Sequence, residues 1–517
     1  MGMGSIPAAF RRAAAEYATQ PAIRLLEQHL TFTQIDQASD RIAAGLAAQG
    51  IGLGHRVGLY CGNGPEFAQA YLGILKAGAT VVPINLLLSP GEIRYILQDA
   101  EVHALLYQQT LLERANAARE GLPGLRLGVM IGPGAPPSGD SSLEALLAAP
   151  GLVPAPAFDP AQDVAAILYT SGTTGQPKGA QLTHRNLLAN AAGVRQALEL
   201  RPGEDVLLVV LPLFHAFAAT VGMLTPLLYG LSLAPVPRFE PALVVDTIEA
   251  TGATIFLGVP SMYALFLRLP AAQIPRWRSI RFCVSGGAAL PVAVLEGFEQ
   301  RFGIPILEGD GPTECGPVTC VNPLEGPRKP GSVGRPIPGV AMRILDDRDA
   351  ELPDGEIGEV CVRGASVMKG YLNRPEADAE AFFGDWFRTG DLGYRDSDGY
   401  FFLVDRKKDM LIVNGVNVYP RVLEEVLHRH PGIAEAAVVG EPHPLHGEVP
   451  IAYVVAKENM TLDAAEVRAW CRGHLGRHEL PRRVVVRERL PRNAAGKILK
   501  RELRREGELE RGIDSRG

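Results

Sequence analysis

The stretch YTSGTTGQPKGAQLTH, from Tyr169 to His184, decides how the rest of this chain is interpreted. It follows DVAAILYT, an apolar run with the length of a buried strand, and precedes HRNLLANAAGVRQAL, which has helical periodicity. Glycines let backbone N–H groups approach a phosphate closely, hydroxyls donate hydrogen bonds, and a lysine adds positive charge. The stretch therefore predicts a single short loop that cradles a polyphosphate. Its donors and glycines are Thr170, Ser171, Gly172, Thr173, Thr174, Gly175 and Lys178.

This loop does not follow the Walker A pattern, because Pro177 stands before Lys178 and Gly179 follows it. A glycine- and threonine-rich surface loop is the simpler interpretation, but so many donors directly after a buried strand argue against it. The segment YTSGTTGQPKG instead resembles the signature of the adenylate-forming superfamily. That superfamily comprises acyl- and aryl-CoA synthetases, luciferases and the adenylation domains of peptide synthetases.

Further motifs that resemble this superfamily follow in the expected order and cover nearly the whole chain. They are LPLFHAFA (211–218), SGGAAL (285–290), EGDGPTE (308–314), WFRTGDLGY (386–394), FLVDRKKDMLIVNG (402–415) and PRNAAGKILKREL (491–503). Each motif alone has a plain structural explanation, such as tight helix packing, a surface turn or an ion pair. Their order favours the functional interpretation. The resemblance then implies an ATP site made by the loop above with Gly287, Ala288, Glu308, Asp310, Gly311, Thr313, Asp391, Arg406 and Lys497.

The same resemblance implies the catalytic residues. Glu314 and Thr170 would hold Mg²⁺, a hard cation that prefers oxygen ligands. Lys497, on a glycine-containing turn, resembles the lysine that catalyses adenylation. His215 would stand at the wall of the carboxylate pocket, although a core histidine with satisfied hydrogen bonds is the alternative for this residue.

The adenosine part of ATP would contact three motifs. Asp391, which is expected after a Thr-Gly turn, and Arg406 resemble the superfamily's ribose contacts, and Thr313 would lie near the α-phosphate. Asp310 departs from the pattern, because most members carry an aromatic residue there that stacks on adenine. The departure puts stacking in doubt, and Asp310 would instead accept a hydrogen bond from the adenine amino group.

The acid substrate is expected to bind in a pocket lined by His215, Phe217, Val259, Met262, Tyr263 and Gly286. Because none of these residues is an arginine or a lysine, an apolar tail is favoured over a second carboxylate. The stretch VMKGYLNRPEADAEAF and the LPLFHAFA motif most resemble bacterial medium- and long-chain fatty acid–CoA ligases.

Two residues of the FLVDRKKDMLIVNG motif imply a moving domain. Lys408 matches the hinge about which the C-terminal domain of superfamily members reorients, and Gly415 matches a loop glycine that approaches the pantetheine of CoA. The resemblance implies that Lys497 serves the first half-reaction and that rotation then brings the Gly415 face to the site.

At 517 residues the chain is long enough for two domains. We expect residues 1–405 to form an N-terminal AMP- and acyl-binding domain of parallel-rich sheets with a small β subdomain after Gly331. Residues 406–517 would form a smaller mobile α/β domain that ends in an arginine-rich helix. The fold class is therefore α/β.

Composition narrows the setting of the protein. The net charge of −6 gives no general reason to bind nucleic acid, and the six scattered cysteines suggest buried thiols in a reducing compartment. The apolar segment 206–236 could span a bilayer by length, but its three prolines favour a buried strand, a loop and a core helix. We expect a cytoplasmic protein without a transmembrane anchor; peripheral membrane contact and a homodimer stay open.

The sequence thus predicts a ligase that uses ATP, Mg²⁺ and CoA to convert a fatty acid to acyl-adenylate and then to acyl-CoA. The alternatives are an aryl-CoA ligase for cinnamate- or benzoate-like acids and an acyl-AMP ligase that loads an acyl carrier protein. A luciferase-like oxidation is disfavoured. A non-catalytic protein that binds nucleotide or acyl groups is also disfavoured, because Lys497 and Glu314 are both present.

Overall fold

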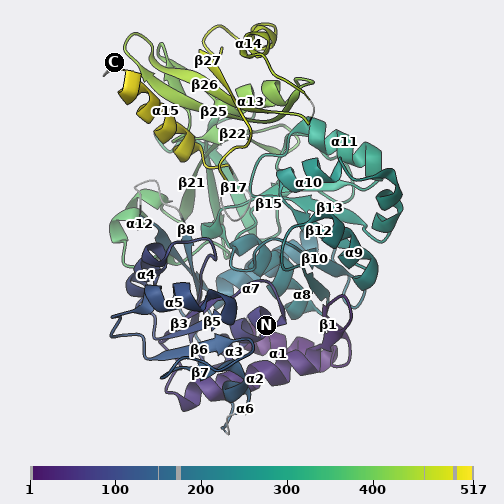
Figure 1. Cartoon of the computed structure of the whole chain (residues 1–517), viewed down its shortest axis with the longest axis vertical. Helices are drawn as coiled ribbons and strands as arrows, with labels where there is room; N and C mark the ends of the chain where they lie inside the picture. Colours follow the sequence, from purple (N-terminus) through teal and green to yellow (C-terminus); the bar gives the residue numbers. More distant parts are fainter. Residues whose placement is uncertain (1–3, 149–150, 171–175, 459, 493–497, 515–517) are drawn as a thin grey trace.

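The structure, a computed structural model, describes residues 4–148, 151–170, 176–458, 460–492 and 498–514, with side chains described up to residue 507. The described chain forms four β-sheets packed with α-helices, arranged as a large N-terminal domain and a smaller C-terminal domain (Figure 1). This arrangement confirms the predicted α/β class. The C-terminal domain, in light green and yellow, lies at one end of the molecule (Figure 1).

The largest sheet has nine described strands, of which those from β14 to β1 are parallel to their neighbours. The edge strands β16, β15 and β2 pair antiparallel. Strands β10, β12 and β13 are buried at every residue, as expected for parallel strands with both faces covered. In sheet order the strands are β16 (Arg335–Pro336), β15 (Cys320–Val321), β14 (Ile306–Asp310), β13 (Phe282–Ser285), β12 (Ile255–Gly258), β10 (Val206–Val209), β11 (Ser232–Pro235), β1 (Pro21–Arg24) and β2 (His29–Thr31).

The second sheet has eight described strands, parallel from β8 to β7, with β9 and β19 added antiparallel at one edge. In sheet order they are β19 (Gly370–Tyr371), β9 (Lys178–Thr183), β8 (Val164–Thr170), β4 (Thr80–Pro83), β3 (Arg56–Tyr60), β5 (Ala104–Gln108), β6 (Leu127–Ile131) and β7 (Ser141–Ser142). The two large sheets confirm the parallel-rich architecture that alternating strands and helices predicted.

The signature stretch is not one loop, as the sequence suggested, because its second part forms β9. This strand pairs antiparallel with β8, with Thr170 opposite Lys178. Alternation explains the difference: Ala180 and Leu182 are buried, whereas Gln181 between them is half-buried. Thr183 then ends the strand and begins α7 (His184–Ala197), because its side chain accepts a hydrogen bond from the third residue of the helix.

A third sheet forms the predicted small β subdomain, and all its strand pairs are antiparallel. Asp391 lies within a long strand of this sheet and not after a turn, as the sequence suggested. Gly390, with φ of 72°, allows a register shift inside the strand and not a chain reversal. The strands are β17 (Val340–Leu345), β18 (Gly358–Gly364), β20 (Phe382–Phe383), β21 (Trp386–Arg395) and β22 (Phe401–Arg406).

The fourth sheet belongs to the C-terminal domain and has its own buried core. Its pairs are antiparallel except that β27 runs parallel to β26. The predicted arginine-rich helix is present as α15 (Lys500–Asp514). The strands are β23 (Leu411–Val413), β24 (Val416–Val418), β25 (Ile433–His443), β26 (Gly447–Ala456) and β27 (Arg483–Arg487).

Helices cover the faces of these sheets (Figure 1). In the N-terminal domain they are α1 (Ile6–Glu16), α2 (Phe32–Ala48), α3 (Pro65–Lys76), α4 (Pro90–Asp99), α5 (Leu112–Arg119), α6 (Leu143–Ala148), α8 (Thr225–Tyr229), α9 (Pro241–Thr251), α10 (Pro260–Phe266), α11 (Val292–Phe302) and α12 (Pro375–Ala381). The C-terminal domain adds α13 (Pro420–His428) and α14 (Ala464–Arg472). Short helical turns are η1 (Gln109–Leu111), η2 (Ala218–Leu224), η3 (Ala271–Trp277) and η4 (Thr313–Cys315).

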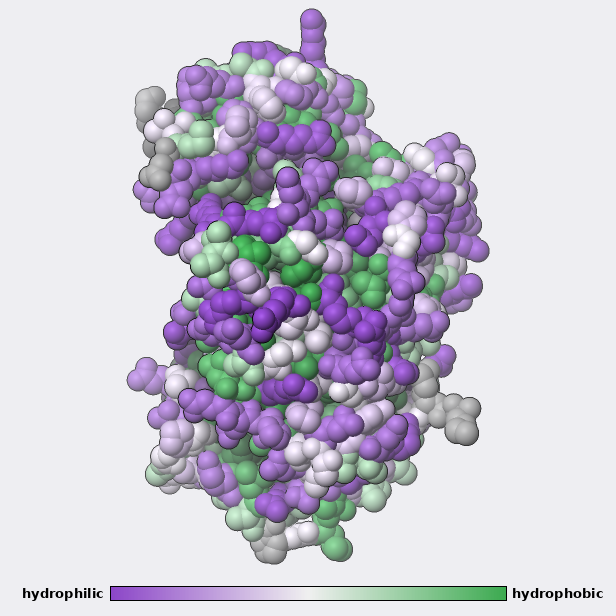
Figure 2. All heavy atoms as spheres, turned by 90° about the vertical axis from the view of Figure 1, so that its right-hand side faces the viewer, coloured by the Kyte–Doolittle hydropathy of each residue, from purple (hydrophilic) through white to green (hydrophobic). Residues whose placement is uncertain are grey.

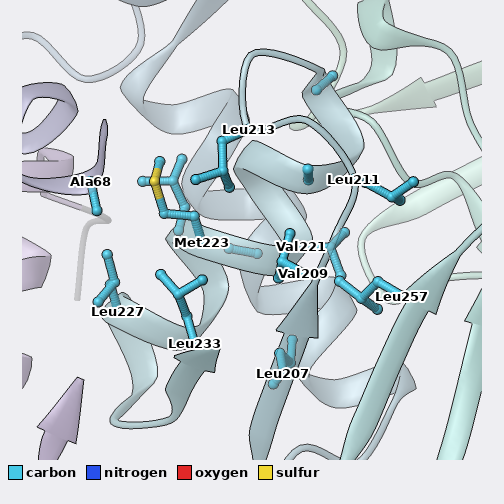
Figure 3. Packing of buried hydrophobic residues seen from close by; sticks show 14 of the residues in the cluster. Ala68, Leu207, Val209, Leu211, Leu213, Val221, Met223, Leu227, Leu233 and Leu257 are labelled. Carbon is cyan, nitrogen blue, oxygen red and sulfur yellow. The ribbon is translucent and has the colours of Figure 1, made fainter. Parts of the chain in front are cut away.

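The apolar segment 206–236 lies in the main core. It runs through β10, a loop, the π-helical turn η2, α8 and β11, which confirms the predicted strand, loop and core helix. Figure 3 shows Leu207 and Val209 of the strand near Val221 and Met223 of the turn, all within one buried cluster. Over the part of the chain that the structure describes, no helix has both the length and the apolarity needed to cross a bilayer.

The surface is mostly polar. Hydrophilic side chains, in purple, cover most of the face drawn in Figure 2. All six cysteines are buried and unpaired, as their scattered positions predicted. Because the drawn face is polar, we expect the functional site at the ends of the sheets and not on an exposed apolar surface.

Candidate active site

Several of the predicted site residues lie at or beyond the carboxyl ends of parallel strands in both large sheets. Ligands of open α/β sheets bind beyond that edge, because the loops that follow parallel strands gather there. The strands β8, β10, β12, β13 and β14 lead directly into segments that carry Thr170, His215, Val259, Gly286 and Gly311. The structure therefore brings together motifs that are far apart in the sequence.

Glu314, on η4, links the two edges. Its Oε1 atom accepts hydrogen bonds from Thr170 Oγ1 at 3.1 Å and from Tyr371 Oη at 2.9 Å. The Lys178 ammonium lies 5.2 Å from the centroid of the Tyr371 ring, within range of a cation–π contact. Two predicted site residues, Glu314 and Lys178, thus contact Tyr371, and Thr170 shares the Glu314 carboxylate with it.

The sequence analysis assigned no role to Tyr371. A signal was present, because this tyrosine lies in the stretch VMKGYLNRPEADAEAF that resembles the superfamily. A single tyrosine beside apolar residues has the pattern of a core side chain, however, and only the tertiary contact with Glu314 shows otherwise.

The surroundings of Glu314 fit a Mg²⁺ ion. One carboxylate and the Thr170 hydroxyl offer oxygen donors, and Mg²⁺ is commonly held by one or two carboxylates together with substrate phosphates. No cluster of three or more histidine, cysteine or acidic side chains with metal-site geometry occurs among the described residues. The donor set therefore suits an ion that accompanies ATP better than a fully protein-bound metal.

Glu308, on β14, is a buried carboxyl group under the SGGAAL segment. Its Oε1 atom accepts a hydrogen bond from the Leu290 N–H at 3.0 Å, while Oε2 has no hydrogen-bond partner among the described residues. Burial raises the pKa of Glu308 to about 7, although the charge of Arg421 and the Leu290 N–H act in the opposite direction. This side chain fixes the position of the segment that carries Gly287 and Ala288, two residues of the predicted ATP site.

Asp310, Asp391 and Arg406 lie near one another. Arg406 is directly opposite Asp391 in the β21–β22 pair, and its Nε atom lies 3.3 Å from Asp391 Oδ1. Burial alone would lower the pKa of Arg406, but the Asp391 and Asp310 carboxylates raise it. The backbone carbonyl of Asp310 accepts hydrogen bonds from Thr319, which fixes this end of β14.

Gly311 is required by close backbone packing. A Cβ atom there would lie 2.0 Å from the Pro317 carbonyl oxygen, so no larger residue fits. Thr313 is half-buried on η4 next to Glu314. Both predicted nucleotide contacts therefore belong to the short segment that leads from β14 to Glu314.

Residues predicted to line the acyl pocket meet at the SGGAAL segment. A Cβ atom on Gly286 would lie 3.4 Å from the Phe217 ring, and one on Gly287 would lie 3.8 Å from Val259. Gly287, with φ of 78°, and Ala288 are exposed, and α11 begins at Val292, after the end of the motif. Phe217 and Val259 thus form an apolar wall against this loop.

Two other predicted pocket residues have different surroundings. Tyr263 is completely buried, and its hydroxyl donates to the Val284 carbonyl at 2.7 Å while its ring packs on Phe256. It lies in the core, next to the nearly buried Met262. His215 is half-buried, and the Phe217 N–H approaches its Nδ1 atom at 3.5 Å.

The C-terminal domain contacts the N-terminal domain through two helix N-termini. The Asp405 carboxylate accepts a hydrogen bond from the Arg421 N–H in the first turn of α13 at 2.9 Å. In return, the Glu425 carboxylate of α13 accepts one from the Val292 N–H at the start of α11. Each carboxylate therefore caps a helix of the other domain.

The remaining predicted residues are placed as follows. Lys408 is exposed in the segment after β22. Gly415 is exposed at the turn between β23 and β24, with φ of 78°. The predicted residues Ser171, Gly172, Thr173, Thr174, Gly175 and Lys497 lie outside the described residues.

Glu308→Gln should change how stability depends on pH. In the folded protein the carboxyl group holds its proton up to about pH 7, whereas in the unfolded chain it loses it near pH 4.5. The unfolded state therefore binds fewer protons in this window, and wild-type stability falls as pH rises. Relative to the variant, we expect a loss on the order of 1–3 kcal/mol between those pH values.

Thermal unfolding of both proteins at closely spaced pH values checks this expectation. Between pH 4.5 and 7 the stability of the variant should rise relative to that of the wild type. Above pH 7 the two stability curves should run parallel. Parallel curves throughout would mean that Glu308 is ionised in the fold, held by Arg421.

Comparisons with known proteins agree with this geometry. The sequence profile described as AMP-binding enzyme matches residues 10–372, and the profile described as AMP-binding enzyme C-terminal domain matches residues 422–497. A sulfoacetate–CoA ligase of Cupriavidus necator is 40% identical over 472 residues, which cover 91% of each protein. A long-chain-fatty-acid–CoA ligase of Bacillus subtilis is 34% identical over 516 residues, covering 95% of this chain and 92% of that protein.

A solved structure shows the same fold over the whole chain. The crystal structure of an anthranilate CoA ligase in complex with anthranoyl-AMP superposes with a TM-score of 0.92 at 30% identity, covering 98% of each chain. The motifs, the meeting of the two strand edges at Glu314 and these matches lead to one conclusion. The chain belongs to the AMP-binding enzyme family.

Proposed function

We propose that this protein is an AMP-forming acid–CoA ligase whose substrate is a fatty acid. Acid–CoA ligase activity is supported by the family and by relatives that match almost the full length of the chain. The fatty-acid assignment rests on the apolar wall that Phe217 and Val259 form against Gly286 and Gly287. An alkyl chain gains free energy when such a wall removes it from water.

The chemistry requires two anions to meet. A carboxylate oxygen of the acid attacks the α-phosphorus of ATP; the new P–O bond forms as the bond to the β-phosphate oxygen breaks, and pyrophosphate leaves. Lys178 would offset part of the charge of the phosphates, and the Thr170 hydroxyl would donate a hydrogen bond to them. Glu314 and Thr170 would hold Mg²⁺, which when bound would supply further positive charge. Positioning and electrostatic stabilisation provide the catalysis, so no protein nucleophile is needed.

The other site residues would bind the nucleoside and the acid. Asp391, with Arg406 beside it, would accept hydrogen bonds from the ribose hydroxyls. Gly287 and Ala288 would contact adenine, and His215 would stand near the acid's carboxylate. Lys497, which lies outside the described residues, would bridge the carboxylate and the α-phosphate.

Transfer to CoA would follow a change in domain orientation about Lys408. In the orientation seen here α13 is docked on the N-terminal domain, and Arg421 is close enough to act on the charge of Glu308. Gly415 is exposed in this orientation. Rotation would release α13, withdraw Lys497 and bring the Gly415 turn to the site, where the CoA thiolate attacks the acyl carbon and AMP leaves.

An aryl acid is the second candidate substrate. The wall that would hold an alkyl chain can also hold an aromatic ring, and a neighbour in structure was solved with anthranoyl-AMP. Sulfoacetate, named for the relative from Cupriavidus necator, carries a second negative charge. The wall residues Phe217, Val259, Gly286 and Gly287 offer no cation to pair with it, which favours an uncharged tail.

A panel of acids tests the substrate assignment. Release of AMP should be fastest with octanoate, palmitate or oleate, slower with benzoate and cinnamate, and near background with sulfoacetate. Parallel assays without CoA should give pyrophosphate but little turnover, and an acyl carrier protein should not replace CoA. Turnover with an aryl acid or sulfoacetate and none with fatty acids would overturn the fatty-acid assignment.

Asp310 is predicted to accept a hydrogen bond from adenine in place of the stacking ring. Because water competes for both partners, a typical hydrogen bond contributes roughly 0.5–1.5 kcal/mol net, so Asp310→Ala should raise the KM for ATP about two- to tenfold. The KM for the acid serves as the internal control and should not change. Asp310→Tyr should be tolerated, since the ring would restore stacking. An unchanged KM for ATP in Asp310→Ala would show that the carboxylate points away from the base.

Lys408→Pro tests the hinge. Proline fixes φ, and a hinge residue must change its backbone angles between two states. Adenylation should persist, whereas thioester formation from preformed acyl-AMP should fall by about tenfold or more, which corresponds to about 1.4 kcal/mol on the barrier. Lys408→Ala, which removes only the side chain, is the control.

Lys497→Ala should show the opposite pattern. Adenylation should fall about 10²–10³-fold, as for loss of one preorganised electrostatic contact, while thioester formation from preformed acyl-AMP persists. Equal loss of both half-reactions in either variant would contradict the two-orientation mechanism.

A further inference from the structure

The antiparallel pair of β8 and β9 contains the signature stretch and is called here the signature hairpin. The segment from Gly370 to Arg374 lies directly against it. Its first residues form β19, which pairs with β9 so that Tyr371 is opposite Ala180. The Leu372 N–H also donates to the Gly179 carbonyl at 2.8 Å. The segment is therefore fixed by backbone hydrogen bonds to the strand that begins with Lys178.

Tyr371 contacts two groups of the proposed nucleotide site. Its hydroxyl donates to Glu314 at 2.9 Å, and its ring faces the Lys178 ammonium at 5.2 Å from the centroid. One side chain thus sets the distance between a carboxylate and a lysine that lie on different segments.

Arg374 connects the two ends of the signature hairpin through α4. Its guanidinium contacts Asp99 at 2.8 Å and the Tyr95 hydroxyl at 3.0 Å. Asp99 accepts a hydrogen bond from Tyr169, next to Thr170, at 2.7 Å. Tyr95 donates to the carbonyl of Pro177, next to Lys178, at 3.1 Å.

The spacing on α4 explains this arrangement. Tyr95 and Asp99 are four residues apart, so they share one face of the helix. That face meets the residue before Thr170 and the residue before Lys178 at the same time. Arg374 lies between the two side chains, and its Nη2 atom donates to both.

We propose that Tyr371 and Arg374 are positioning residues that fix the relative places of Thr170, Lys178 and Glu314 for ATP. Tyr371 acts directly on Glu314, and Arg374 acts through Asp99 and Tyr95 on both ends of the signature hairpin. The proposal rests on the proposed function, because it takes these three residues to be the phosphate and metal contacts. It assigns a role to a segment whose motif carried none.

The chain contains a matched control. The first triad of a tyrosine, an aspartate and an arginine consists of Tyr169, Asp99 and Arg374. A second one consists of Tyr107, Asp140 and Arg119, with the Tyr107 hydroxyl 2.6 Å and the Arg119 guanidinium 2.7 Å from Asp140. Tyr107 lies on β5, which is separated from β9 by three strands of the same sheet. The two triads share their chemistry and partial burial, and only one of them touches the signature hairpin.

Tyr371→Phe removes the hydroxyl and keeps the ring over Lys178. We expect the Mg²⁺ concentration for half-maximal activity and the KM for ATP to rise between about three- and thirtyfold, since a hydrogen bond to a charged group is lost. The KM values for the acid and CoA should not change. Tyr107→Phe should lower the thermal midpoint similarly and leave all four constants unchanged.

A double-mutant cycle tests whether Tyr371 acts through Glu314. In a Glu314→Gln background the carboxylate charge is already absent, so Tyr371→Phe should have much less effect than in the wild type. Additive effects of the two substitutions would overturn the assignment of Tyr371 to Glu314.

Arg374 is tested with a graded pair of variants. Arg374→Ala should raise the KM for ATP about tenfold or more. Arg374→Lys keeps the charge but not the planar guanidinium, so its KM for ATP should lie between those of Arg374→Ala and the wild type. Arg119→Ala should destabilise the protein without changing the KM for ATP. An equal shift in Arg119→Ala, or no shift in Arg374→Ala, would overturn the positioning role.

Direct binding of α,β-methylene-ATP with Mg²⁺, measured by calorimetry, separates this proposal from the proposed function. If the wild type binds the analogue but no acid supports AMP release, the function fails and the affinities of the variants still decide the positioning role. If the variants bind the analogue as tightly as the wild type, the positioning role is wrong whatever the substrate.

Discussion

The contact between Thr170 and Glu314 is the interaction on which the site depends. Thr170 ends β8 of one large sheet, and Glu314 follows β14 of the other, 144 residues later in the chain. A hydroxyl and a carboxylate can meet at 3.1 Å only if the carboxyl edges of the two sheets face each other. The hydrogen bond therefore depends on the packing of both sheets, and Lys178, a proposed phosphate contact, lies opposite Thr170 in the β8–β9 pair.

Charge explains why this junction is built from so many linked side chains. A triphosphate and a carboxylate must be brought together, so the site needs cations and donors at fixed distances. Lys178 is on a strand, and Glu314 is on a short helical turn held by the Met368 N–H at its carbonyl. If Lys178 and Glu314 were free to move, part of the electrostatic stabilisation of the reacting groups would be lost. The ring of Tyr371 restricts Lys178, and its hydroxyl restricts Glu314.

The reciprocal caps between the domains are suited to a contact that must also break. Asp405 and Glu425 each accept a hydrogen bond from a helix N-terminus of the other domain. When the domains separate, these N–H groups become exposed to water. Water can replace such hydrogen bonds, so the free-energy difference between docked and undocked states stays small. Apolar burial of the same area would hold the domain much more tightly. The proposed rotation about Lys408 is compatible with this kind of interface.

The sequence by itself determined the family, the α/β class and the identity of most proposed site residues, because motif order, apolar runs and glycine-rich turns are local properties. It also predicted that Thr170, Glu314, Asp391 and Arg406 share one site, and the structure brings Thr170 to Glu314 and Arg406 to Asp391. Tertiary structure decided the rest. Lys178 to Thr183 became a strand because β8 offered a paired edge, and Tyr263 became a core residue because Phe256 and Phe298 surround it. The motif that contains Tyr371 and Arg374 does not reveal their roles, since their partners lie far away in the chain and meet them only when the sheets and α4 have packed.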